Sequence, residues 1–341
     1  MIVDAVASLL AVGGRCRAGT FAGQPPAPGT FAAQLWTACA TGVPGLRVPI
    51  GDGGDLGSLS DRTDARWHEV LVSAAGRNSP YEALREVTAT GCGLPGPVAC
   101  LTLGGAALRG QHGRRWHAEP GNLHLSVAVP CDLDAATCGP SLPMLAAVAA
   151  CEAVETLLGH ATAASRGLAV KWVNDIVIDE GKAGGVLTAL RTRGPRITEY
   201  FAGLALNLAA APVLPPDPFA LPAAALRVSG PAPALGPAAA AVMERLLDHL
   251  EQVAEHGAEA LVEAYRSRSL VLGREVAVWE AGIRERLAVG EGTRRLPPPV
   301  RRGRVASIGA DLALLLAGQD EPVRDGCLRL VAPHRPDPEP A

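Results

Sequence analysis

Residues 171–190, KWVNDIVIDEGKAGGVLTAL, place charged and amide side chains between two apolar runs. The runs, residues 176–178 and 186–190, have the length and composition of short strands, and residues 179–181 between them are typical turn formers. The pattern therefore predicts a strand, a tight turn and a second strand that begins near Lys182.

Lys182 is followed by Gly184 and Gly185, which leave the backbone open to close approach by a ligand. A lysine beside a glycine-lined surface suits an anion such as a carboxylate or a phosphate. An ordinary surface hairpin would carry similar charges, because isolated lysines and aspartates are usually solvated. The residues alone leave both interpretations open.

This segment resembles the central signature of the biotin–protein ligase family, in which Lys-Trp-Pro-Asn-Asp precedes an apolar run and Lys-x-x-Gly-Ile/Val-Leu. Val173 stands where the family favours proline. Residues 113–126 contain Gly-Arg-Arg-Trp and Pro-Gly-Asn-Leu-His-Leu-Ser, and residues 203–208 read Gly-Leu-Ala-Leu-Asn-Leu; both resemble family blocks. Three blocks in the family's order make the resemblance specific, and it extends over about residues 62–332.

The resemblance implies an α+β fold, with a class II synthetase-like mixed β-sheet, packed helices and a small C-terminal SH3-like β-barrel. We expect the biotin/lipoate ligase catalytic domain at residues 62–266 and the barrel at residues 267–332. Residues 1–61 form a Gly/Pro-rich extension with too few Lys and Arg for a clear helix-turn-helix. The proline-rich tail, residues 333–341, is predicted to be disordered.

Apolar periodicity predicts the main elements of these two parts. Helices are predicted at residues 81–87, 142–158 and about 242–265. Strands are predicted at residues 98–103 and 123–129, and shorter ones at 271–278, 303–309, 312–316 and 326–331. Proline-rich residues 212–237 are predicted to form a connection over the surface.

Composition narrows the functional classes. The 31 Lys and Arg against 34 Asp and Glu give a net charge of −3, which does not favour general binding to DNA. No apolar run has membrane-spanning length, and residues 1–12 lack the basic start of a signal peptide. The 8 cysteines fit no zinc template, and neither do His112, His117 and His124, so we expect a reducing, cytoplasmic setting.

The resemblance implies an ATP-dependent ligase that activates biotin as the acyl-adenylate biotinyl-AMP and transfers it to a lysine of a carboxylase's biotin-carrier domain. Both steps develop negative charge on phosphoryl or acyl oxygens, so positioned cations and N–H groups should matter most. The implied catalytic residues are Lys182, between the carboxylate and the α-phosphate, Arg109 and Asp175. Asp175 would orient the acceptor amine or hold Mg2+.

The resemblance also implies residues that bind the nucleotide or the acid. They are Asn78, Gly110, Gln111, Gly113, Arg114, Trp116, Asn122, Asn174 and Gly184. Gln111 replaces an arginine of the family's Gly-Arg-Gly-Arg-x-Gly loop, and Gly105 replaces a glutamine that contacts biotin. The family's Ser-Thr-Asn becomes residues 76–79, with its hydroxyl displaced to Ser79. The adenylating half of the site therefore resembles the family more closely than the biotin-reading half.

Structural roles are the alternative for several of these residues: turn capping for Asn174 and Asp175, core packing for Trp116 and a scaffold role for Lys171 and Trp172. Three functions stay open. They are a biotin ligase, a lipoate or octanoate ligase or transferase of the same fold, and a non-catalytic relative that binds an acyl-adenylate or a carrier domain. Members of the family often pair through sheet edges, which allows a homodimer.

Overall fold

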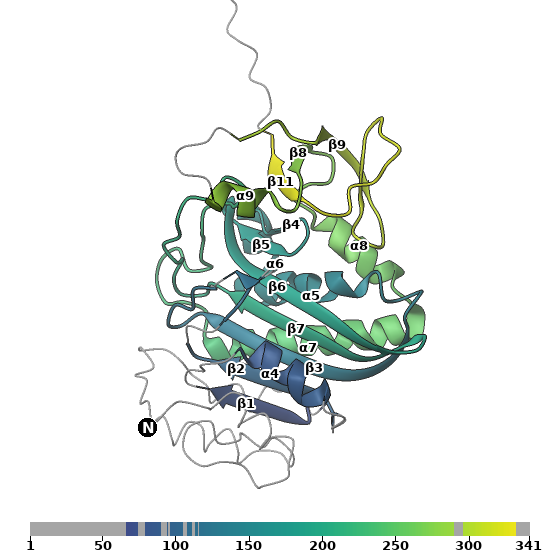
Figure 1. Cartoon of the computed structure of the whole chain (residues 1–341). Helices are drawn as coiled ribbons and strands as arrows, with labels where there is room; N and C mark the ends of the chain where they lie inside the picture. The colour runs from purple at the N-terminus through teal and green to yellow at the C-terminus, as the bar shows by residue number, and fades with distance from the viewer. Residues whose placement is uncertain are drawn as a thin grey trace, which may run out of the picture.

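The computed structural model describes residues 66–73, 79–89, 94, 96–104, 108–110, 113–114, 116–289 and 296–331. They form a seven-stranded sheet and a four-stranded sheet, with helices packed on the larger one (Figure 1). The predicted extension at residues 1–61 and the predicted tail at residues 333–341 lie outside the described residues.

The larger sheet has the strand order β1-β2-β3-β7-β6-β5-β4. Its strands are β1 (Glu69–Ser73), β2 (Val98–Thr102), β3 (Leu123–Asp134), β4 (Ala169–Lys171), β5 (Asp175–Ile178), β6 (Gly181–Arg193) and β7 (Arg196–Leu206). Strands β1 and β2 are parallel and the other neighbours are antiparallel. This mixed sheet with packed helices confirms the predicted α+β class.

The hairpin predicted around Lys182 is present. Strand β5 ends at Ile178, β6 begins at Gly181, and the two connecting residues, Asp179 and Glu180, have φ angles of 50° and 60°. Two consecutive residues with positive φ match the right-handed twist of the flanking strands in a two-residue hairpin. Arg166 holds this turn through an ion pair of 2.6 Å to Asp179.

Six helices are described: α4 (Pro80–Ala89), α5 (Leu142–Leu158), α6 (His160–Ser165), α7 (Leu235–His256), α8 (Glu259–Ser267) and α9 (Ile283–Val289). The prediction of one helix over residues 242–265 is wrong. Gly257, with a φ of 84°, ends α7, and α8 starts separately two residues later. A glycine in this conformation ends a helix because other residues are strained there.

The two faces of the large sheet have different coverings (Figure 1). Leu125 and Val127 of β3 belong to the main core, which includes the nearly all-apolar α5 and the inner face of α7. Ala128 and Phe201 lie on the opposite face, where Tyr81 of α4 packs on them. Because α4 covers only one end of this second face, the rest is available to form a site.

The smaller sheet has the order β10-β9-β8-β11 and is antiparallel, as expected for a small C-terminal barrel. Its strands are β8 (Glu275–Trp279), β9 (Arg301–Ile308), β10 (Leu314–Leu316) and β11 (Cys327–Leu330). Helix α9, which the sequence did not predict, lies between β8 and β9 in the chain.

The proline-rich residues 212–237 are more than a surface connection. Phe219 and Leu226 are each 2% exposed, and the ring of Phe219 meets Trp279 edge-on at 5.3 Å between centroids. The prediction was wrong in this respect because proline density indicates irregular backbone but does not show what that backbone packs against. The segment joins the two sheets.

Among the described residues, Cys138, Cys151 and Cys327 have buried free thiols, and no helix is long and apolar enough to cross a membrane.

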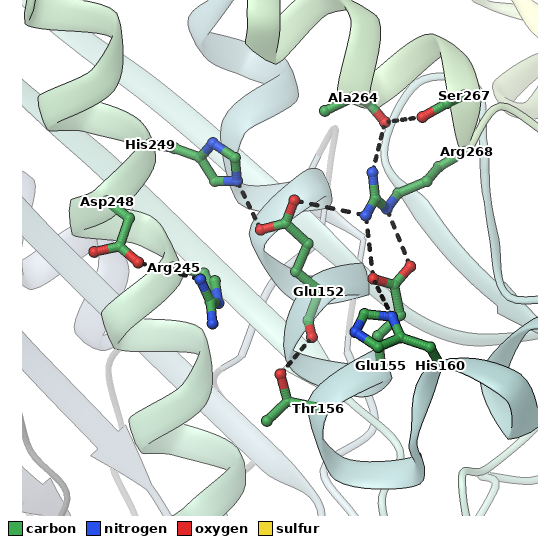
Figure 2. Close-up of polar contacts among 10 residues, drawn as sticks. All are labelled: Glu152, Glu155, Thr156, His160, Arg245, Asp248, His249, Ala264, Ser267 and Arg268. Carbon is green, nitrogen blue, oxygen red and sulfur yellow. Dashed lines mark hydrogen bonds and ion pairs between the residues drawn. The ribbon is translucent and has the colours of Figure 1, made fainter.

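An ion network ties α5 to α7 and to the end of α8 (Figure 2). Arg268 lies 3.1 Å from Glu155 and 3.6 Å from Glu152, and Nε2 of His249 lies 2.9 Å from Glu152. Burial alone would raise the pKa of Glu152. The hydrogen bond with His249 and the charges of His249 and Arg268 lower it by more, so the pKa lies below its ordinary value. The ionised carboxylate is therefore the form that the folded state favours.

We expect Arg268→Met to lower the free energy of unfolding by about 1–3 kcal/mol, because two half-buried carboxylates would lose their cation. Arg245→Met is the matched control. Arg245 is 40% exposed and pairs with Asp248 one helical turn away, so its loss should cost about 0.5 kcal/mol or less. Urea unfolding at pH 7.5 compares them, and equal losses in the two variants would contradict a stabilising network.

The same pair of proteins gives a pH test. A carboxyl group whose pKa is lowered by folding stabilises the protein above its unfolded pKa, and this contribution disappears as the pH falls and the group is protonated. The difference in stability between the wild type and Arg268→Met should therefore shrink below about pH 4.5, the unfolded value for Glu152. A difference that is constant from pH 7 to pH 4 would exclude this linkage.

Candidate active site

The uncovered part of the second sheet face forms the floor of a cavity of about 1370 Å3. Strands β3, β6 and β7 supply the floor, and residues 212–223 with Leu287 and Leu296 supply a wall on the side of the smaller sheet. Ligand cavities usually measure roughly 300–1000 Å3, so this one has room for two ligands side by side.

Lys182 projects into this cavity because β6 contains a β-bulge. Ile176 pairs with Gly184 and Val177 pairs with Lys182, which leaves Ala183 without a partner on β5. In a regular strand Lys182 would lie on the same face as Val186, whose side chain is in the main core. The extra residue reverses this direction, as bulges near functional sites commonly do.

The predicted catalytic pair is brought together. Nζ of Lys182 lies 2.5 Å from Oδ1 of Asp175 and 5.6 Å from the centroid of the Trp116 ring. The side chains of Lys182 and Asp175 are 25% and 17% exposed, so both reach the cavity. The Asn174 amide also lines the cavity and donates a hydrogen bond to the carbonyl of Val186.

The floor beside this pair consists of small residues. Asp175 pairs with Gly185, Gly185 pairs with Ala205, and Ala205 pairs with His124, so these four form one row across the sheet. Glycine and alanine in the middle of the row leave the backbone accessible to a ligand.

In the neighbouring row, Gly203 lies between Leu187 and Ser126. A Cβ atom at Gly203 would lie 3.2 Å from the ring of Tyr81. Tyr81 therefore closes the floor at the end next to α4, where burial raises the pKa of its hydroxyl to about 12.

The predicted loop residues Arg109, Gly110, Arg114 and Trp116 all line the cavity. Two backbone hydrogen bonds fold this loop back on itself, from Gly110 to the carbonyl of Arg114 at 2.6 Å and from Trp116 to the carbonyl of Leu108 at 3.0 Å. Gly113 has a φ of 69° and lies outside the lining. Asn78 and Gln111 lie outside the described residues.

Asn122 and Gly184 make contacts that support the fold. The Asn122 amide is 1% exposed, donates to Asn207 and to the carbonyl of Ala210, and accepts from the N–H groups of Ala209 and Ala210. A Cβ atom at Gly184 would lie 2.5 Å from the carbonyl oxygen of Ala205. The predicted contacts of both residues with ligands stay predictions.

The signature segment is fixed from the C-terminal side. Nε1 of Trp172 donates to the carbonyl of Leu312 at 2.7 Å, and the Tyr265 hydroxyl donates to the carbonyl of Val173 at 2.8 Å. Lys171 is buried, with its Nζ 3.4 Å from the carbonyl of Phe219, and burial lowers its pKa although the Asp175 charge opposes this. Contacts from α8, from the connection between β9 and β10 and from Phe219 thus orient the turn that precedes Asn174.

Residues 212–223 are a part of the site that sequence reasoning missed. The N–H of Lys182 donates to the carbonyl of Pro222, and the N–H of Ala224 donates to the carbonyl of Lys182. Arg284 of α9 forms an ion pair with Asp217 and stacks on Phe219 at 5.1 Å from the ring centroid. No motif marks this segment, and only its contacts reveal it.

His124 is the second residue that was missed, because its spacing was tested only against metal sites. It lines the cavity and is 3% exposed. Burial lowers the pKa of His124 to about 4, with partial opposition from the backbone carbonyl of Glu119. The imidazole is therefore neutral at neutral pH.

A metal site built by the protein alone does not occur among the described residues, where no three His, Cys, Asp or Glu side chains cluster suitably. Asp175 provides one hard oxygen ligand at the cavity. A second carboxylate of the lining, Asp217, is already paired with Arg284.

Comparisons with known proteins agree with this arrangement. The model of the Biotin/lipoate A/B protein ligase family matches residues 104–207. A biotin–[acetyl-CoA-carboxylase] ligase of Paracoccus denitrificans is 33% identical over 120 residues, which are 35% of this chain and 48% of that protein. A bifunctional ligase/repressor BirA of Bacillus spizizenii is 32% identical over 101 residues, 29% of each chain. The chain thus spans about half the length, or less, of these relatives.

A solved structure extends the likeness in fold. The biotin protein ligase from Aquifex aeolicus, in complex with biotin and ATP, superposes with a TM-score of 0.53 at 19% identity and covers 77% of this chain and 98% of its own. The residues that the family model matches, 104–207, include the cavity loop, the bulged hairpin and strands β3 and β7. Residues 104–207 thus match the biotin/lipoate A/B protein ligase family, and the fold is similar to that of a biotin protein ligase.

Proposed function

We propose that this protein is an ATP-dependent ligase that activates biotin as biotinyl-AMP and transfers it to a lysine of a biotin-carrier domain of a carboxylase. The observation that carries the proposal is the direction of Lys182, which the bulge at Ala183 turns into a glycine-floored cavity beside Asp175 and Trp116. The relatives named above as biotin ligases supply the substrate class.

In the first step, a carboxylate oxygen of biotin attacks the α-phosphorus of ATP, and the bond to pyrophosphate breaks. Negative charge increases on the phosphoryl oxygens in this step, so a fixed cation lowers the barrier. Lys182 would exchange its ion pair with Asp175 for contact with the carboxylate and the phosphate. Arg109 and Arg114 line the same cavity and would neutralise the remaining charge.

In the second step, the amine of the acceptor lysine attacks the acyl carbon and AMP leaves. The attacking amine must be neutral and correctly directed, and a carboxylate can accept its proton or hold it in place. Asp175 is the carboxylate beside Lys182 in the cavity. It would become free to accept the proton of the amine when Lys182 leaves their ion pair to contact the adenylate. Mg2+ would enter with ATP, held by the nucleotide phosphates with Asp175 as one ligand, and would offset phosphate charge.

A homodimer that formed through an edge of the large sheet would have to use β1. The other edge strand, β4, is already extended by backbone hydrogen bonds between Val170 and residues 268 and 270. A sheet edge with paired backbone groups cannot add another strand.

A lipoate or octanoate ligase is the second candidate, because the matching family model covers lipoate as well as biotin ligases. Both enzymes would use Lys182 alike, so the acid tested distinguishes them. The fold alone does not choose between them.

Lys182→Ala should lower acid-dependent exchange of labelled pyrophosphate into ATP by roughly 100-fold or more, because the cation at the reacting oxygens is lost. Biotin, lipoate and octanoate are assayed in parallel. The control is Arg193→Ala, which removes an exposed cation at the far end of the same strand and should leave exchange unchanged. Undiminished exchange in Lys182→Ala would refute the assigned role, and no exchange with any acid in the wild type would refute the ligase proposal.

Asp175→Asn should slow the transfer of biotin from preformed adenylate to a carrier domain by roughly 10–100-fold, because the amide cannot accept the proton of the amine. Single-turnover transfer is measured beside pyrophosphate exchange. Glu180→Gln, an exposed change in the same hairpin, is the control. Undiminished transfer together with a loss of pyrophosphate exchange would show that Asp175 acts in adenylation and not in transfer.

A further inference from the structure

His124 is a buried polar side chain that faces the cavity without satisfying its hydrogen-bonding capacity. It is 3% exposed, and neither ring nitrogen makes a full hydrogen bond among the described residues, although the carbonyl of Glu119 lies close enough to affect the pKa of the ring. His249 differs in having one nitrogen satisfied: its Nε2 is paired with Glu152 at 2.9 Å, whereas its Nδ1 is without a partner among the described residues. Buried polar groups are normally satisfied, and an exception calls for an explanation such as a ligand.

The register of the sheet places His124 at the end of the cavity floor opposite the ion pair. It lies in the row Asp175, Gly185, Ala205, His124, on the fourth strand of the row. With strands about 4.8 Å apart, His124 lies roughly 10 Å from Gly185 and roughly 14 Å from Asp175 across the sheet. The floor thus has a charged end, a small-residue middle and a polar end.

A second unsatisfied group lies beside His124. Leu101 of β2 pairs with Leu125 of β3, and one step further along this antiparallel register Thr102 lies beside His124. The Thr102 hydroxyl is buried and without a partner among the described residues, as is Nε1 of Trp116 at the charged end. Polar groups without partners at both ends of the cavity floor match a ligand that is polar at both of its ends.

We propose that His124 is the specificity residue that recognises a hydrogen-bonding group at the end of the acid away from its carboxylate. The inference rests on the proposed function and narrows its substrate class. A neutral imidazole offers one donor and one acceptor, which complements a cyclic urea with its N–H groups and carbonyl. An acid with such a head group, as in biotin, satisfies His124, whereas a plain aliphatic acid such as octanoate leaves it unpaired.

The preference should be large, because a site built to bond a polar group rejects ligands that lack it. This residue also compensates for the altered biotin-reading part of the sequence at Gly105 and residues 76–79. Recognition would come from β3, in the middle of the sheet.

The test measures the binding of the acids by calorimetry on the full chain without ATP, at pH 7.5. For the wild type, biotin should bind at least 10-fold more tightly than octanoate and than an acid of equal length whose ring lacks the urea group. His124→Phe keeps an aromatic ring but removes both nitrogens, and should raise the Kd for biotin by roughly 10–100-fold while leaving that for octanoate within about twofold. His256→Phe, an exposed change at the end of α7, is the control.

Three results would overturn the inference: a biotin Kd in His124→Phe within twofold of the wild type, equal weakening of both acids, or tighter binding of octanoate than of biotin by the wild type. His124→Gln retains a donor and an acceptor and should restore part of the biotin affinity. If His124→Phe fails to fold, the wild-type acid series and His124→Gln still decide the matter. Failure of the proposed function has a different signature, since absent pyrophosphate exchange leaves these binding results intact.

Discussion

Strands β5 and β6 pair in two registers, and the change between them fixes the direction of Lys182. Ile176 pairs with Gly184 and Val177 pairs with Lys182, so Ala183 is unmatched. Without this bulge, regular alternation would bury the Lys182 ammonium against the core helices, where an unpaired charge is very unfavourable. With it, the ammonium meets Asp175 at 2.5 Å above a glycine floor. The ion pair and the contact of Lys182 with Trp116 both depend on this one extra residue.

The bulged hairpin is held from several sides, which explains why the smaller sheet matters to a site on the larger one. Trp172 and Val173 are bonded to Leu312 and Tyr265, and the backbone of Lys182 is bonded to residues 222–224. The proline-rich segment in turn packs on β8 and α9 through Phe219. A site that must distinguish bond-making geometries of about 0.5 Å needs such support behind its catalytic groups. The contacts between the sheets supply it here.

The sequence predicted the elements whose patterns are local. The apolar run at residues 142–158 became a buried helix with the expected ends, and the turn at residues 179–181 became the expected hairpin. The break at Gly257 was missed because apolar periodicity continues on both sides of it. The bulge could not be predicted, because it is a property of how β6 pairs with β5 and not of either strand. The role of residues 212–223 depends in the same way on distant partners.

The two ends of the cavity also differ in whether residues close together in the sequence form them. Asp175 and Lys182 are seven residues apart and meet within one hairpin, so a short motif is enough to place both. His124 reaches the same floor only because β7 lies between β3 and β6. A short motif is therefore enough to predict Lys182 and Asp175 as the reacting end, whereas the proposed acid-recognising end depends on strands far away in the chain. Under the proposed assignment, a change at position 124 would alter which acid binds and leave Lys182 and Asp175 unchanged.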